Sequence, residues 1–102
     1  MIEPLDGPSK QFILSSVGTT TPVEVKAGTS PFDERKVVTL QADGKFYVFF
    51  SDTEEVPTST DVSTKGFIQY KNSLRSYEAG QFQKIYVLAV SGTINIRGAE
   101  RA

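Results

Sequence analysis

The sequence predicts an all-β domain, a single compact β-sandwich of about eight strands. The β-branched residues Val, Ile and Thr account for 26 of the 102 residues, and Phe and Tyr add 11 more; these residue types suit a pleated, half-buried surface. Turn-forming residues recur at short intervals, as sandwiches and barrels require, and no window shows a sustained period of 3.6 residues. Eight strands fit either a jelly-roll or an immunoglobulin-like order.

The first two expected strands are Gln11–Ser15 and Thr21–Lys26. In the second, Val23 and Val25 alternate with charged residues, which indicates one buried and one solvated face. Pro22 suits an edge position or a strand start. A loop at 29–34 follows.

The clearest expected hairpin joins Lys36–Ala42 to Lys45–Ser51 through Asp43-Gly44. Asp-Gly favours a type I′ turn, which requires a positive φ at the glycine. The second strand is apolar on both faces, so it is either central in its sheet or covered by a neighbouring element.

A polar stretch at 52–65 is expected to be a long loop, a feature that is often functional. Four strands then complete the pattern: Gly66–Tyr70, Leu74–Glu78, Lys84–Val90 and Thr93–Arg97. The nearly continuous apolar run of Lys84–Val90 predicts burial on both faces. The expected domain limits are an N-terminal arm at 1–10, the sandwich at 11–98 and a C-terminal tail at 99–102.

Composition excludes several kinds of chemistry. The chain has no His, Cys or Trp, which removes imidazole and thiolate catalysis, Cys/His zinc sites, iron–sulfur clusters and haem ligation through histidine. No serine-nucleophile signature is present. We therefore expect no enzymatic activity, no cofactor and no metal.

The charge balance is close to neutral. Eleven basic and twelve acidic residues give a net charge of −1, whereas a nucleic-acid-binding domain usually carries a basic excess. The longest apolar run, Ile85–Val90, is too short to span a membrane, and the acidic start of the chain does not resemble a secretory signal. Neither nucleic acid nor a membrane is an expected partner.

Two groups of residues are candidate interaction sites. The acidic segment with Asp52, Glu54, Glu55 and Asp61 could bind calcium, but it lacks the spaced pattern of an EF-hand loop; paired carboxylates would also suit a glycosidase, which needs a cleft that a domain of this size rarely forms. Asp52, Glu54 and Glu55 remain candidates for a partner interface.

The N-terminal arm is the second candidate, with Ile2, Pro4 and Leu5 as contacts. Ordering a short segment costs about 1–2 kcal/mol per residue, so the arm is expected to order only against a partner.

Aromatic residues provide a third set of possible contacts. Phe12, Tyr70, Tyr77, Phe82 and Tyr86 are candidate interface anchors, because aromatic side chains are enriched at protein–protein contacts. The aromatic strand Lys45–Phe50 also resembles a base-stacking strand, but packing in a core explains it equally well.

Several segments between Val17 and Glu100 resemble small virion proteins of tailed bacteriophages. The segment 34–41, Glu-Arg-Lys-Val-Val-Thr-Leu-Gln, is similar to their NRKxLTIQN segment, and Gly66-Phe67-Ile68 is similar to their GFPL. Lys71-Asn72-Ser73-Leu74 replaces their APGES turn. The segment 85–100, Ile-Tyr-Val-Leu-Ala-Val-Ser-Gly-Thr-Ile-Asn-Ile-Arg-Gly-Ala-Glu, resembles their C-terminal IYAISASGTxxVRVxE pattern and is the most specific of these matches.

The resemblance implies a β-sandwich of the virion, of the head-decoration, cement or collar type. The implied function is a non-enzymatic structural protein that binds the head surface, assembled in the host cytoplasm. Its implied partners are the major capsid protein or other virion proteins and further copies of itself. The alternative is a tail or collar appendage module that binds a partner protein or a carbohydrate.

Overall fold

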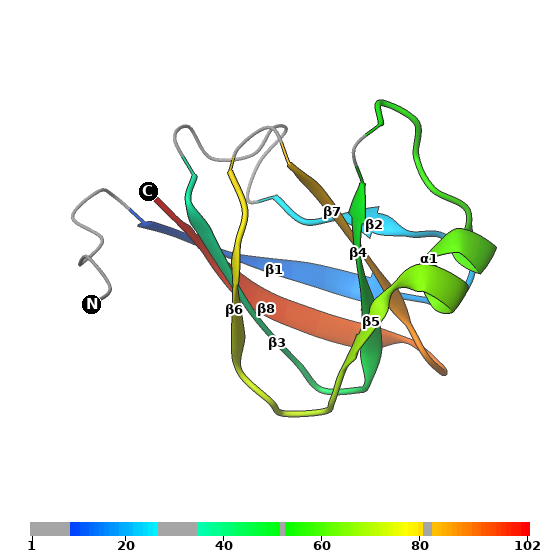
Figure 1. The fold of residues 1–102 in the computed structure, drawn as a ribbon. Coiled ribbons are helices and arrows are strands. Elements are labelled where there is room, and N and C mark those ends of the chain that lie inside the picture. The colour runs from blue at the N-terminus through cyan, green and yellow to red at the C-terminus, as the bar shows by residue number, and fades with distance from the viewer. Residues whose placement is uncertain (1–8, 27–34, 52, 81–82) are drawn as a thin grey trace.

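The computed structural model describes residues 9–26, 35–51, 53–80 and 83–102. It contains eight strands and one helix in these ranges (Figure 1). In chain order they are β1 (Ser9–Val17), β2 (Val23–Glu24), β3 (Val37–Ala42), β4 (Phe46–Ser51), α1 (Ser59–Lys65), β5 (Phe67–Gln69), β6 (Arg75–Glu78), β7 (Lys84–Ala89) and β8 (Ile94–Arg101).

The strands form two four-stranded antiparallel sheets, which confirms the predicted all-β sandwich. One sheet has the order β1-β8-β3-β6 and the other β2-β7-β4-β5. Four strand pairs are nested one inside the next along the chain. The outermost pair is β1–β8, followed by β2–β7 and β3–β6, and the innermost is β4–β5. This arrangement is a long hairpin folded over on itself, which is the strand order of a jelly roll. It resolves the choice between the two orders that the sequence left open.

The expected Asp43-Gly44 hairpin is wrong. β3 and β4 belong to different sheets, so this dipeptide crosses between the two layers. Gly44 does not have a positive φ; Gly92 is the glycine that does, among the residues described. Glycine is needed at position 44 for a different reason, since a Cβ there would lie 2.4 Å from Cγ2 of Ile94.

The main core lies between the sheets and follows the predicted alternation. Val38, Leu40, Phe46, Val48 and Ile96 are buried in it, and β7 is buried on both faces as predicted. A second, smaller cluster lies on the outer face of the second sheet, where Tyr86, Leu88 and Val62 pack together with Tyr47 and Phe49.

Helix α1 replaces part of the long loop that the sequence predicted. Thr58 caps it: its side chain accepts a hydrogen bond from the backbone N–H of Asp61 (3.1 Å), and the Asp61 carboxylate accepts one from the N–H of Thr58 (3.3 Å). Val62 is the buried residue of the helix. α1 therefore covers the outward aromatic face of β4 and supplies the covering element expected for that strand.

The two ends of the described chain pair with each other. β1 begins at Ser9 and β8 continues to Arg101, with Ser9 opposite Arg101. Residues 9–10 and 99–101, expected in the arm and the tail, therefore lie in strands. No helix within the described ranges is long and apolar enough to cross a membrane.

A buried ion pair lies near one end of the sandwich, between strand β8 and the segment that leads into β3. Nη1 of Arg35 lies 2.8 Å from Oε2 of Glu100, and both side chains are fully buried. The Arg35 guanidinium also donates to the carbonyl oxygens of Val25, Ala79, Gly80 and Gln83. One side chain thus fixes the end of β2, the segment after β6 and strand β8.

Candidate functional site

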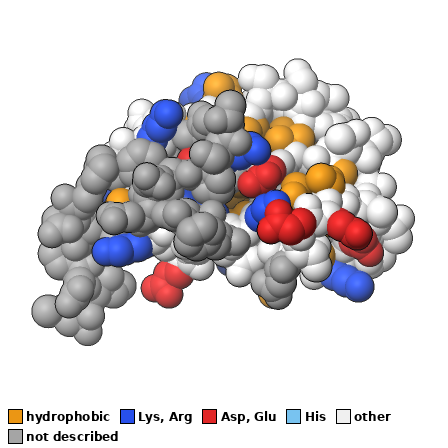
Figure 2. Space-filling model, turned by 90° about the horizontal axis from the view of Figure 1, so that it is seen from above, with side chains coloured by type: hydrophobic (Ala, Val, Ile, Leu, Met, Phe, Trp, Pro, Cys, Tyr) orange, Lys and Arg blue, Asp and Glu red, His pale blue; other side chains and the backbone are white. Residues whose placement is uncertain are grey.

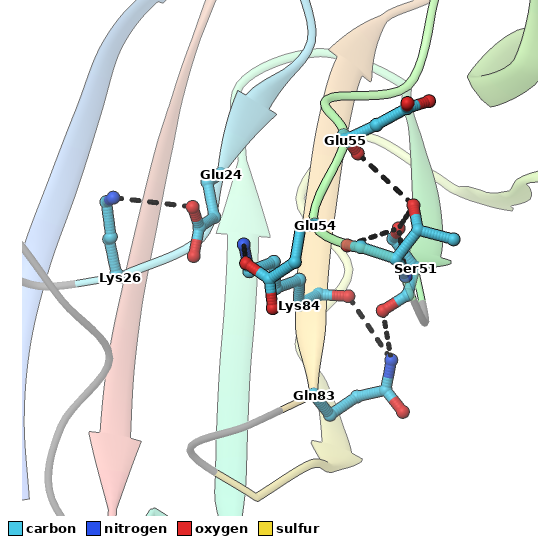
Figure 3. A network of polar contacts seen from close by, with 8 residues as sticks. Glu24, Lys26, Ser51, Glu54, Glu55, Gln83 and Lys84 are labelled. Atoms are coloured by element: carbon cyan, nitrogen blue, oxygen red, sulfur yellow. Dashed lines mark hydrogen bonds and ion pairs between the residues drawn. The ribbon is translucent and has the colours of Figure 1, made fainter.

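A charged cluster lies beside the start of β7. Nζ of Lys84 is 3.2 Å from the carboxylate of Glu54, and Nζ of Lys26 is 3.3 Å from that of Glu24 (Figure 3). The hydrogen bond to Glu54 raises the pKa of Lys84 above its ordinary 10.5, and Glu24 acts in the same direction. Viewed from above, acidic and basic side chains lie next to one another (Figure 2), so charges of opposite sign compensate locally.

The acidic candidates do not converge in the structure. The Glu54 carboxylate accepts a hydrogen bond from the Lys84 ammonium. Glu55 is exposed, and its backbone carbonyl accepts a hydrogen bond from the Thr53 hydroxyl. Asp61 belongs to the helix cap. No group of three or more acidic residues within the described ranges could hold a metal ion. Ile2, Pro4, Leu5 and Asp52 lie outside the described residues.

Exposed apolar side chains gather instead along β5 and the turn that follows it. The exposed fractions are 67% for Phe67, 44% for Ile68, 62% for Tyr70 and 68% for Leu74. We call these four residues the β5 patch. Phe67 lies opposite buried Val48, and Ile68 lies opposite Tyr47 of the outer cluster, so the patch extends over both faces of this edge strand. Exposed apolar side chains that gather at one place are typical of interaction surfaces in soluble proteins.

Buried Gln69 holds the β5 patch in place. Its side-chain amide donates to the carbonyl oxygens of Leu40 (2.7 Å) and Ser73 (3.0 Å), and its Oε1 accepts from the Tyr77 hydroxyl (2.8 Å). Because the partners lie in β3, in β6 and in the turn, one side chain ties β5 to the opposite sheet. The residues flanking Gln69 are therefore presented on a fixed backbone.

An aromatic series connects the β5 patch to the interior. The ring of Phe67 contacts that of Phe50 edge-on, with centroids 6.4 Å apart, and Phe50 contacts Tyr77 in the same way at 5.8 Å. Burial raises the pKa of Tyr77 above 10.0, while nearby Arg75 opposes this shift. Tyr77 therefore remains a neutral hydrogen-bond donor to Gln69 at physiological pH.

Basic residues lie next to the β5 patch, in space or in the sequence. Nζ of Lys45 lies 5.8 Å from the centroid of the Tyr70 ring, within range of a cation–π interaction. Lys65, Lys71 and Arg75 are exposed nearby in the sequence, and positions 62–77 contain no Asp or Glu. The patch is therefore apolar, with Lys45 on its Tyr70 ring and basic rather than acidic residues among its sequence neighbours.

Sequence reasoning identified only one member of this surface. Tyr70 is exposed as an interface anchor requires, whereas Phe12 and Tyr77 are half-buried and Tyr86 is buried; Phe82 lies outside the described residues. Phe67, Ile68 and Leu74 were missed as contacts because the pattern placed them in ordinary strands. The feature of the sequence that could have identified this surface is the short strand at 67–69, which contains no charged residue.

No known protein-family model matches this chain, and a search of curated proteins finds no significant match. The site must therefore be interpreted from its own chemistry. An apolar and aromatic surface with a basic border can bind a polypeptide segment through apolar contacts and charge, without any reacting group.

Proposed function

We propose that this chain is a non-enzymatic structural protein of a tailed-phage particle, a capsid decoration or cement protein that binds the head surface. One observation carries the proposal. Arg35 lies in segment 34–41 and Glu100 ends segment 85–100, two of the segments that resemble the phage virion proteins, and the two residues form the buried ion pair. If these two segments resemble the family because they build the same fold, they should contact each other in the folded chain. The ion pair between them is such a contact.

Two further features support the proposal. Jelly rolls recur in viral capsid proteins, although that fold also serves other functions. The β5 patch adds a surface of the kind that protein partners cover. The proposed partners are the major capsid protein, other virion proteins and further copies of this chain, and the proposed location is the virion.

The decisive experiment is to locate the chain on its particle. Quantitative mass spectrometry of purified particles should give a copy number comparable with that of the major capsid protein, and an electron-microscopy map should place the sandwich on the head. Absence from purified particles would overturn the proposal.

Binding to particles that lack the chain then tests the surface. We expect Phe67→Ser with Leu74→Ser to weaken binding, whereas Ile13→Ser should not. Ile13 is a matched control, because it is 54% exposed and lies on β1 in the other sheet.

The exposed rings of Phe67 and Tyr70 favour one second candidate, a tail or collar module that binds a carbohydrate, since sugars stack on exposed aromatic rings. A low copy number at the tail, together with glycan-array binding that Tyr70→Ala abolishes, would select this alternative.

A further inference from the structure

A polar hollow lies on the outer face of the β1-β8-β3-β6 sheet, on the opposite side of the sandwich from α1. Side chains alternate between the two faces of a strand, so Gln41 and Asp43 share the outer face while Ala42 between them is buried. Gln41 is paired with Arg97 of β8, and Asn95 lies two residues before Arg97 on the same face. These exposed side chains form the floor of a hollow of about 250 Å³.

Asn72, in the turn between β5 and β6, lines one side of the polar hollow. Its backbone N–H donates to the carbonyl oxygen of Ala42 (2.9 Å), and its own carbonyl oxygen accepts from Nε2 of Gln41 (3.2 Å). Its φ is 63°, a conformation that asparagine adopts more readily than most residues. Because the turn is tied to β3 in this way, the Asn72 side chain has a fixed position beside the floor.

Hydrogen bonds also orient the polar groups of the floor. The backbone N–H of Asp43 donates to the carbonyl oxygen of Asn95 (3.3 Å), and that of Asn95 donates to Oδ1 of Asp43 (2.9 Å). Oδ1 of Asn95 accepts from the backbone N–H of Ser16 (3.1 Å), so Nδ2 is the end of this amide that remains for a ligand. Nε2 of Gln41 is bonded to the turn, so its Oε1 remains.

The hydrogen-bonding capacity left in the polar hollow is mixed. Four groups have no partner within the described residues: Oδ2 of Asp43, Oε1 of Gln41, Nδ2 of Asn95 and the Arg97 guanidinium. The first two accept hydrogen bonds and the last two donate them, and the two charges are opposite. An anion would face the Asp43 carboxylate and a cation would face Arg97. Hydroxyl groups both donate and accept, so a neutral ligand with several hydroxyls satisfies both kinds of group.

The size of the polar hollow fits one sugar unit. Drug-sized ligands occupy pockets of about 300–1,000 Å³, whereas this hollow measures about 250 Å³. A second hollow, of about 420 Å³, adjoins it along β8 and shares Arg97 with it. Arg97 therefore lies between two positions, where one side chain can contact adjacent units of an oligosaccharide.

We propose that this outer face of the sheet binds a neutral oligosaccharide. One sugar unit occupies the polar hollow and exchanges hydrogen bonds with Asp43, Asn72 and Asn95. Arg97 contacts this unit and the next one. The site lies apart from the β5 patch and does not depend on the particle, so its failure would leave the proposed head-surface function untouched.

The test is an NMR titration of the isotope-labelled full chain with neutral saccharides. The probes are glucose, galactose, mannose and N-acetylglucosamine, each as the monosaccharide and as short oligomers. At least one series should shift the backbone amide signals of 41–43 and 95–97 saturably. The disaccharide should bind more tightly than the monosaccharide, because it reaches both sides of Arg97.

Two substitutions test the polar groups. Asp43→Asn keeps an acceptor for the Asn95 N–H but replaces the other oxygen with a donor, and Arg97→Met removes the guanidinium. Each should weaken binding by about tenfold or more, the usual effect of losing a hydrogen bond to a charged group. Arg101→Met is the matched control, because it removes the same charge from an exposed position on the same face of β8, outside both hollows. It should leave binding unchanged.

The absence of shifts at these amides with every saccharide would overturn the proposal. So would shifts confined to residues 67–70, which would place the sugar on the β5 patch instead. An equal response to inorganic phosphate would show an anion site and would also overturn it, as would binding that both Asp43→Asn and Arg97→Met retain.

Discussion

Arg35 is the most heavily bonded side chain among the described residues. Its five N–H donors have five acceptors: four backbone carbonyls and the Glu100 carboxylate. A guanidinium can be buried only when its donors are satisfied in this way. Lysine could not replace it, since an ammonium has three donors and no planar fork.

We expect Arg35→Met to lower the free energy of unfolding by about 3–5 kcal/mol, the usual effect of removing one member of a buried ion pair. Urea denaturation measures this change. Arg97→Met is the control, because Arg97 is exposed on the same strand as Glu100 and should change stability by less than about 0.5 kcal/mol. Equal effects of the two substitutions would contradict this role for Arg35.

Gly44 is required by packing rather than by backbone conformation. Gly44→Ala should destabilise the fold by about 1–3 kcal/mol, the usual effect of overpacking, because its Cβ would meet Cγ2 of Ile94. In an Ile94→Leu background, which removes that methyl group but keeps the side-chain size, the same substitution should cost less. A thermal double-mutant cycle measures the difference, and strictly additive effects would show that the contact is not the cause.

At the scale of elements, the alternation of apolar residues predicted all eight strands within a few positions. It could not predict which strands pair, because Asp43-Gly44 is a good hairpin sequence in isolation. The connection is decided by distant residues: Asp43 exchanges hydrogen bonds with Asn95 of β8, which holds the turn on the first sheet while Phe46 enters the second.

Helix α1 was missed because its stabilisation is mostly tertiary. Seven residues are too few for a stable isolated helix, and Val62 is its one buried residue. The available signal was the Thr58–Asp61 spacing before Val62, which is a capping-box pattern. The β5 patch was missed for a related reason, since strand patterns do not reveal which apolar strand lies at an edge.

Thr58→Ala should remove the cap and destabilise the domain by about 1 kcal/mol. Hydrogen exchange at the amides of α1 should increase more than exchange in β7. Thr60→Ala, at an exposed position inside the helix, is the control and should be neutral or slightly stabilising. Uniform acceleration of exchange across the molecule would show that α1 is not a separate unit.

For the whole molecule, three groups make stability depend on pH in the same direction. The pKa values of Tyr77, Tyr86 and Lys84 are all raised in the folded protein: the two tyrosines mainly by burial, and Lys84 mainly by its hydrogen bond to Glu54. Each group holds its proton more tightly when folded. Its contribution is therefore complete below its ordinary pKa, 10.0 for tyrosine and 10.5 for lysine, and is lost as pH rises further.

We expect the Tm to be nearly constant from pH 8 to about 9.5 and then to fall as these three groups lose their protons. Circular dichroism at a series of pH values measures this. Tyr86→Phe should make the alkaline decline shallower, because it removes one of the three ionisations. An unchanged slope in that variant would show that Tyr86 does not contribute.

The nested strand pairs also constrain the order in which the chain can fold. The partners β4 and β5 are close in sequence, and those of the pairs β3–β6, β2–β7 and β1–β8 are successively farther apart. Closing short loops first costs the least entropy, so folding should begin beside α1 and proceed outward. The Arg35–Glu100 ion pair can then form only after β8 has paired with β3, so the buried charge of Arg35 has no partner carboxylate until the last strands join.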